Sequence, residues 1–235
     1  FVADLYLYQQ SFTKGFEAAY GDIYNTCIIA LLPNYQEQGD SSLIYMIDSL
    51  IEQSGNSKSG FYLNEKNILL ETLLELKKSK TKTLLIGVTY ALLDFIEKQN
   101  IDFSNLIVME TGGMKGRRKE IVREELHEIL RDGFGVSTIH SEYGMTELLS
   151  QAYSFGNGVF KTPSWMKILT REISDPLSLC KENKTGGINV IDLANVSSCC
   201  FISTQDLGRT LGNNQFEIIG RFDNSDTRGC NLMIG

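Results

Sequence analysis

The sequence has few of the residues that build metal centres or disulfide frameworks. It contains two histidines and five cysteines among 235 residues, and no two cysteines have the CxxC spacing of a zinc site. An odd number of cysteines without paired spacing is typical of free thiols in a reducing compartment. We therefore expect a cytoplasmic protein without disulfides or structural zinc.

Basic charge and long apolar segments are also scarce. The 22 Lys and Arg residues are outnumbered by 29 Asp and Glu residues, so the net charge of −7 predicts no nucleic-acid partner. No apolar run approaches the roughly 20 residues that span a bilayer. The first ten residues lack the basic start and apolar centre of a signal peptide. With three prolines and no repeat or low-complexity linker, the chain is long for one domain and short for two.

Apolar runs and amphipathic segments alternate along roughly the first 150 residues. The predicted strands are 27–32, 61–63, 83–88, 105–110 and 135–139, and the predicted helices are 4–20, 43–51, 65–78, 89–98 and 115–132. Asp40 or Ser41 is expected to cap the second helix, and Asn64 the third. This alternation predicts an α/β fold with a parallel sheet, right-handed crossovers and flanking helices.

The pattern changes after residue 157. Residues 158–235 contain short β-prone runs separated by turn residues, and no convincing helix. The sequence therefore predicts an α/β subdomain over residues 1–157 and a smaller β-rich subdomain over residues 158–235.

The segment 138–147 places polar side chains directly after a strand-like approach. Ligands bind at the carboxyl ends of parallel strands. Tyr143 offers a ring for stacking, Thr146 a hydroxyl for a phosphate, and Glu147 a carboxylate for a hard metal ion. The alternative interpretation is a polar turn between a strand and a helix.

Two further predicted strands end in polar tips, at residues 111–113 and 204–209. Gly112 and Gly113 would let a flat ligand approach the backbone, or would form a turn at a helix start. Asp206 could accept two ribose hydroxyls, or could be a turn aspartate. The planar fork of Arg221 could hold a ribose or phosphate, or could lie in a solvated hairpin.

The remaining polar features have less specific interpretations. Residues 115–119 form a basic cluster that could attract a phosphate-bearing partner, or could be a solvated helix face. His140 could orient a carboxylate, transfer a proton, or be satisfied at a strand end. His127 is expected at the surface among helix charges.

Three motifs in order carry a family resemblance: Tyr143–Glu147, Gln205–Arg209 and Gly220–Asp223. Together they resemble the signature motifs of adenylate-forming enzymes, which include acyl-CoA synthetases and luciferases. Within that superfamily, residues 109–118, 140–147 and 228–231 resemble the acyl-protein synthetases of the LuxE type. The resemblance implies the large-domain core of an adenylate-forming enzyme.

The resemblance also implies a reaction and a set of nucleotide contacts. A carboxylic acid, expected to be a fatty acid, would react with ATP and Mg²⁺ to give an acyl-adenylate, and a thiol would then take the acyl group. Tyr143 would stack on adenine, Asp206 would bind the ribose, and Arg221 the ribose or phosphate. Thr146 would bind the phosphate as a catalytic residue, and Glu147 would hold Mg²⁺. The remaining expected nucleotide contacts are Gly112, Gly113, Ser141, Glu142 and Gly144.

Cys230 is the expected acyl carrier, because LuxE-type enzymes carry the acyl group on a cysteine near the C-terminus. Arg228 beside it would lower the thiol pKa, although Cys230 could also be an ordinary packing cysteine. An acyl reductase or carrier protein is the expected partner, and an oligomer is possible. The alternatives are a phenylacetate-type acyl-CoA ligase and a non-catalytic nucleotide- or acyl-binding module. The superfamily's phosphate loop and its C-terminal catalytic lysine are not found in these residues.

Overall fold

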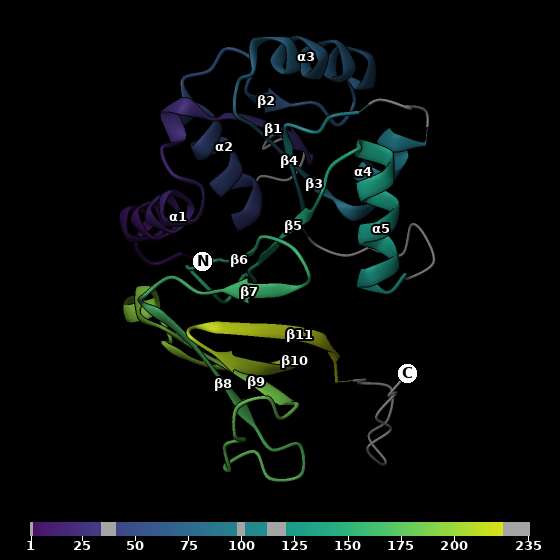
Figure 1. Ribbon diagram of the computed structural model, residues 1–235. Coiled ribbons are helices and arrows are strands. Elements are labelled where there is room, and N and C mark those ends of the chain that lie inside the picture. Colours follow the sequence, from purple (N-terminus) through teal and green to yellow (C-terminus); the bar gives the residue numbers. More distant parts are fainter. Residues whose placement is uncertain (1, 34–40, 98–101, 112–120, 223–235) are drawn as a thin grey trace.

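The protein is built on one hydrogen-bonded sheet of 11 strands in the order β2-β1-β3-β4-β5-β6-β7-β11-β10-β9-β8. The computed structural model describes residues 2–33, 41–97, 102–111 and 121–222. Figure 1 shows the first strands at the top among the helices and the last strands below them. The expected α/β class, with a β-rich part after the parallel sheet, is confirmed.

The first five strands of the sheet pair in parallel, as the alternating pattern predicted. They are β1 (Cys27–Leu31), β2 (Gly60–Phe61), β3 (Thr83–Val88), β4 (Leu106–Thr111) and β5 (Ile139–Tyr143). Every residue of β1 and β3 is buried, because helices cover both faces of a parallel sheet. The carboxyl ends of β4 and β5 therefore meet at one edge.

Five α-helices surround this parallel part. They are α1 (Leu5–Tyr20), α2 (Ser42–Ser54), α3 (Lys66–Ser79), α4 (Thr89–Ile96) and α5 (Arg123–Phe134). Figure 1 shows α1 and α2 on one face of the strands and α4 and α5 on the other. The Ser41 hydroxyl accepts a hydrogen bond from the Ile44 backbone amide at 3.4 Å, which confirms this cap.

The remaining strands pair in an antiparallel manner. They are β6 (Ala152–Ser154), β7 (Val159–Lys161), β8 (Met166–Arg171), β9 (Gly186–Asp192), β10 (Phe201–Gly212) and β11 (Gln215–Arg221). Two short 3-10 helices complete the order, η1 (Ile23–Asn25) and η2 (Leu193–Ser197). No α-helix occurs after residue 134 in the part of the chain that the structure describes.

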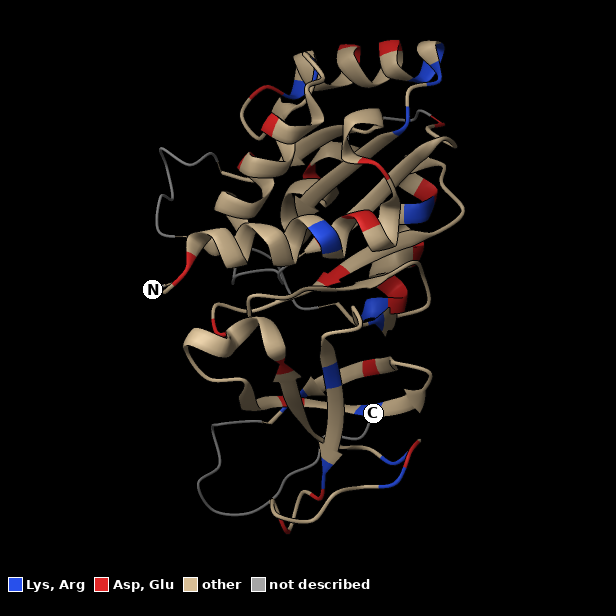
Figure 2. Cartoon of the chain, turned by 90° about the vertical axis from the view of Figure 1, so that its left-hand side faces the viewer, with Lys and Arg blue, Asp and Glu red and all other residues tan. Residues whose placement is uncertain are grey.

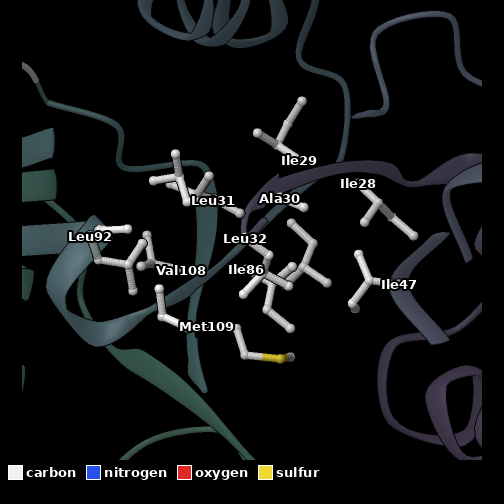
Figure 3. Packing of buried hydrophobic residues seen from close by; sticks show 14 of the residues in the cluster. Ile28, Ile29, Ala30, Leu31, Leu32, Ile47, Ile86, Leu92, Val108 and Met109 are labelled. Carbon is white, nitrogen blue, oxygen red and sulfur yellow. The ribbon is translucent and has the colours of Figure 1, made fainter. Parts of the chain in front are cut away.

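The core of the parallel part lies on both sides of β1. Figure 3 shows Ile28 beside Ile47 of α2, whereas Leu31 lies on the side of Leu92 of α4. A Cβ atom on Gly87 would lie 2.9 Å from Leu92, so a glycine is needed where α4 packs closely on β3. The apolar side chains of β1 therefore pack against helices on both faces of the sheet.

Several sequence-based boundaries were wrong. The helix predicted at 43–51 is Ser42–Ser54, and the strand predicted at 61–63 is Gly60–Phe61. The strand predicted at 135–139 begins at Ile139, because Gly135 ends α5 in the left-handed conformation at a φ of 64°. The helix predicted at 115–132 includes residues 121 and 122, but these two residues precede α5, which begins at Arg123. The third helix has Glu65, not Asn64, at its N-cap.

The proposed division at residue 157 stays a prediction. Buried apolar side chains form two clusters, one under the parallel strands and one around Tyr143, Phe160 and Phe216. The sheet itself continues through β6 and β7 without interruption. The two parts therefore share a backbone hydrogen-bond network and have separate apolar cores.

Charge is spread over the molecule in small groups. In the side view of Figure 2, acidic and basic positions are interspersed along the helices and the lower strands. Within the described residues, no helix is both long enough and apolar enough to cross a membrane.

A buried carboxylate connects the two halves. Asp192 is fully buried and accepts hydrogen bonds from the Ser150 amide, the Ser150 hydroxyl and the Ala194 amide at 2.9, 2.7 and 3.0 Å. The Ser150 hydroxyl also contacts Ser11 of α1 at 3.0 Å and accepts from the Trp165 indole at 2.9 Å. Asp192 therefore links α1, the segment after β5, and the start of η2.

Replacing Asp192 with Ala should lower the free energy of unfolding by about 3 kcal/mol, because three buried donors lose their acceptor. Urea denaturation measures this change. Asp175→Ala is the matched control, since exposed Asp175 also accepts from nearby groups, Leu177 N and Ser178 Oγ. We expect the control to change stability by less than about 1 kcal/mol. Equal losses in the two variants would contradict a special role for the buried carboxylate.

Candidate active site

The strand β5 directs side chains of the segment 138–147 toward two different faces of the sheet. Side chains alternate along a strand, so Ser141 and Tyr143 point to one face and His140 and Glu142 to the other. The prediction that residues 141–143 follow the strand was wrong, because they are the last three residues of β5. Only Gly144 to Glu147 lie beyond the strand end.

On one face, three predicted site residues meet. The Tyr143 hydroxyl donates to Asp206 Oδ2 at 2.8 Å, and Arg221 Nε lies 3.3 Å from Asp206 Oδ1. Tyr143 and Asp206 are each 9% exposed, whereas Arg221 is exposed. Burial and the adjacent Asp206 carboxylate raise the pKa of Tyr143, so its hydroxyl stays a donor.

The Tyr143 ring is supported from behind by two phenylalanines. Its centroid lies 5.9 Å from that of Phe160 and 5.4 Å from that of Phe216. These packed rings fix the position of the tyrosine. Tyr143 also lines the cleft described below, where a flat ligand could meet its ring.

Asp206 lies inside β10, so the prediction of a strand tip at residues 204–209 was wrong. The register of β10 against β9 shifts between Ser203 and Leu207, and an irregularity of this kind re-aims side chains. The Asp206 amide donates to Thr204 Oγ1 at 3.1 Å, which holds the shifted backbone.

Arg171 of β8 stabilises the same irregularity from below. Its guanidinium donates to the carbonyls of Ile188 and Thr204 at 2.7 and 2.6 Å, and to Asn189 Oδ1 at 2.8 Å. It also lies 5.6 Å from the ring centroid of Phe222, next to Arg221. Sequence reasoning missed Arg171, because no motif marks it.

Thr146 and Glu147 are both exposed on a turn that follows β5. Leu148 N donates to the Met145 carbonyl at 3.0 Å and closes the turn. Asn195, which is 2% exposed, donates to the Glu147 carbonyl at 2.5 Å and accepts from Leu149 N at 2.9 Å. The turn therefore presents its side chains on a fixed backbone.

On the opposite face of β5, Glu142 forms a separate contact. Thr111 Oγ1 of β4 donates to Glu142 Oε2 at 2.6 Å. Burial raises the pKa of the Glu142 carboxyl to about 7, the Thr111 hydrogen bond opposes the shift, and nearby Glu110 adds to it. This carboxyl therefore titrates near neutral pH.

The histidines differ from their sequence-based interpretations. His127 was expected at the surface but is 8% exposed, with Nε2 lying 3.7 Å from Glu110 Oε1 and 3.5 Å from Ser141 Oγ. In a nucleophile relay, the hydroxyl and the carboxylate contact opposite nitrogens of the histidine ring. Here Ser141 and Glu110 both contact Nε2, so His127 does not have that geometry. His140 Nδ1 lies 3.1 Å from the Tyr20 hydroxyl, and burial lowers its pKa, as in a satisfied neutral histidine.

A cleft of about 1870 Å³ is lined by residues from both faces of β5. Tyr143, Thr146, Glu147, Asp206 and Arg221 line it, as do Glu142 and Gly144. Four arginines also line it: Arg123, Arg131, Arg209 and Arg221. The structure thus brings these predicted residues to one cavity, while Ser141 lies buried behind it.

Several predictions lie outside the described residues: Gly112, Gly113, Cys230 and the basic cluster 115–119. The other four cysteines have free thiols. Within the described part, no group of three or more His, Cys, Asp or Glu residues is arranged to hold a metal ion. Glu147 can therefore offer Mg²⁺ one exposed carboxylate, and phosphate oxygens would have to complete the coordination.

The residues fit a nucleotide better than a metal centre. Asp206 uses each carboxylate oxygen once, which leaves acceptor capacity for ribose hydroxyls. The cleft also offers guanidinium groups that can bind phosphates, although Arg209 and Arg221 are paired with Glu217 and Asp206 in this structure.

Comparison with known families decides the assignment. The family model described as acyl-protein synthetase, LuxE, matches residues 44–235. The chain belongs to the LuxE family. A search of curated proteins finds no match.

Solved structures of this fold include acyl-activating enzymes. ATP-bound MatB from Rhodopseudomonas palustris has a TM-score of 0.64 at 13% identity, covering 89% of this chain and 42% of that one. A long-chain-fatty-acid-CoA ligase (FadD1) from Archaeoglobus fulgidus has a TM-score of 0.61 at 16% identity, covering 88% and 46%. The O-succinylbenzoate coenzyme A synthetase MenE from Bacillus subtilis, in complex with ATP and magnesium, has a TM-score of 0.59 at 17% identity, covering 88% and 44%. This LuxE-family chain thus has the fold of adenylate-forming enzymes and spans less than half the length of these three structures.

The raised pKa of Glu142 predicts a pH-dependent stability. The folded state binds a proton more tightly than the unfolded state, whose carboxyl has a pKa of 4.5. The resulting contribution to stability is complete below about pH 4.5 and is lost as the pH rises to about 7. We therefore expect Glu142→Gln to gain stability relative to wild type between pH 5 and pH 8, measured by urea denaturation. Parallel pH profiles would contradict the raised pKa.

Proposed function

We propose that the full-length protein activates a carboxylic acid with ATP and then transfers the acyl group to a thiol. The observation that carries this proposal is the cluster of Tyr143, Asp206 and Arg221 at the cleft, beside the fixed turn of Thr146 and Glu147. LuxE-family membership and the fold support it.

In the first step, an oxygen of the acid carboxylate attacks the α-phosphorus of ATP. The bond between the α- and β-phosphates breaks, pyrophosphate leaves, and an acyl-adenylate forms. Asp206 would accept the ribose hydroxyls, Tyr143 would border the adenine, and Arg221 would neutralise the ribose-phosphate end. Arg221 is the most exposed of the three and can move toward a ligand.

The exposed turn would serve the phosphates. Thr146 would donate its hydroxyl to the α-phosphate, and Glu147 would hold Mg²⁺, which supplies charge neutralisation for the leaving pyrophosphate. Nucleotide contacts by Gly112, Gly113, Ser141 and Gly144 remain predictions.

In the second step, a thiolate attacks the acyl carbon, the carbon–oxygen bond to AMP breaks, and AMP leaves. The family resemblance favours a fatty acyl group, Cys230 as the thiol, and an acyl reductase or carrier protein as the recipient. Transfer to coenzyme A, as in a phenylacetate-type ligase, is the second candidate, supported by the coenzyme A ligases among proteins of this fold. A non-catalytic binding module is the third.

Acid-dependent exchange of pyrophosphate into ATP tests the first step. Asp206→Ala should raise the KM for ATP about tenfold or more, because charged hydrogen bonds contribute about 1.5–3 kcal/mol. Exposed Asp175→Ala serves as a control outside the cleft. No exchange with any acid would favour the non-catalytic module, and an unchanged KM in Asp206→Ala would contradict the ribose role.

Cys230→Ala tests the second step. We expect it to abolish covalent labelling by radioactive acid while pyrophosphate exchange continues, because adenylation precedes thiol attack. Cys199→Ala is the matched control, since Cys199 is an exposed free thiol. Label retained in Cys230→Ala would contradict the carrier role. Acyl-coenzyme A formed on addition of coenzyme A would instead support the ligase alternative.

A further inference from the structure

The cleft has two chemically different sides, because successive side chains of β5 point to opposite faces of the sheet. All four arginines that line it among the described residues come from α5, β10 and β11, on the Tyr143 side. On the opposite side, α1 and α2 contribute Tyr8, Ser42, Leu43 and Met46, none of which carries a charge. The guanidinium groups available to phosphates therefore lie on the Tyr143 side, where Arg209 is ion-paired with Glu217 and Arg221 with Asp206.

The opposite side is rich in hydrogen-bond acceptors. Glu142 and Tyr153 are direct partners in the antiparallel β5–β6 register and so share a face. A Cβ atom placed on Gly144 would lie 2.4 Å from Glu142 Oε1 and 3.5 Å from Gln151 Cγ. Glu142 and Gln151 therefore lie side by side at this wall.

One polar atom of this wall has no hydrogen-bond partner among the described residues. Gln151 is 6% exposed and lines the cleft, yet its Oε1 accepts no hydrogen bond from any described residue. Behind the wall, the buried Tyr153 hydroxyl is also unpaired among the described residues, although Tyr153 does not line the cleft. Leaving a buried polar group unsatisfied costs about 1–3 kcal/mol. An unsubstituted alkyl chain bound here would add to that cost by covering Glu142 as well.

We propose that Glu142, Gln151 and Thr111 form the wall of a subsite that selects acids carrying a hydroxyl or amino group away from their reacting carboxylate. This inference rests on the proposed acid-activating function and names its substrate class as a hydroxy or amino acid, in place of an unsubstituted fatty acid. It places Glu142 against the acid, whereas the sequence motif placed it with the nucleotide.

Two features make Glu142 the centre of this selection. Its Oε2 is held by Thr111, so Oε1 is oriented beside Gly144 and Gln151. Its carboxylate has no arginine or lysine partner among the described residues, so it retains the capacity to bind an ammonium or hydroxyl group.

The test compares matched acids by pyrophosphate exchange in the full-length protein. One set is a medium-chain fatty acid with its ω-hydroxy and ω-amino derivatives, and the other is benzoate with its para-hydroxy and para-amino derivatives. We expect at least one derivative to exceed its parent about 10–100-fold in kcat/KM, the size of a charged hydrogen bond. Glu142→Leu should reduce that ratio at least about tenfold, and Glu142→Gln by less. Glu71→Leu, an exposed change on α3, should leave it unchanged.

Each other result overturns the inference in a recognisable way. Parent acids that react as well as their derivatives would overturn the subsite but leave acid activation standing, whereas no exchange with any acid would overturn both. If Glu142→Leu changes the preference for ATP over inosine triphosphate instead of the acid ratio, its partner is the adenine amino group and the inference is wrong. Circular dichroism checks folding, and Gln151→Leu gives a second variant, expected to favour the parent acid.

Discussion

The pairing of β5 on both of its edges is the constraint on which the rest of the site depends. β5 pairs in parallel with β4 and in antiparallel with β6, so the parallel sheet ends and the antiparallel sheet begins at this strand. Its register is therefore fixed from two sides. A slip of one residue would exchange Tyr143 with Glu142 and move each to the wrong face.

Three carboxylates close to this strand have different sets of partners; Asp192 and Asp206 are buried and Glu142 is partly buried. Asp192 has three donors and serves the structure, joining the segment after β5 to α1 and η2. Asp206 has a hydroxyl and a guanidinium and keeps capacity for a ligand. Glu142 has a single donor among the described residues and a raised pKa. Because burial of a carboxylate is costly without partners, the degree of satisfaction separates structural groups from groups that await a ligand.

Local sequence patterns predicted most of the fold. The apolar runs of β1 and β3 are visible because buried parallel strands are apolar on both faces. The short runs after residue 157 indicated strands because turn residues separate them. The extent of β5 could not be read in the same way, since its polar residues His140, Ser141 and Glu142 resemble a loop when their contacts with α1, α5 and β4 are unknown.

The candidate site was predicted only where a motif marks it. Tyr143, Asp206 and Arg221 lie within motifs, and the structure brings them together. Thr111 was noted as a strand tip but not as a partner of Glu142, and His127 was placed on the wrong side of α5. Arg171, Asn195 and Gln151 were missed, because their roles come from backbone carbonyls or an unpaired amide in the folded chain, which no local spacing reveals.

The distribution of charge across β5 also bears on how the two proposed steps would share one cleft. An acyl-adenylate would be held at both ends, with its phosphate beside arginines and its acyl part beside uncharged side chains and Glu142. In that arrangement, attack by a thiol would need access to the carbon between these ends, near the Gly144–Glu147 turn that follows β5. A Cβ atom on Gly144 would lie 2.4 Å from Glu142 Oε1, so a larger residue at position 144 would force the Glu142 carboxylate to shift. We therefore expect the residue at this position to influence the place where the nucleotide side and the acid side of the cleft would meet.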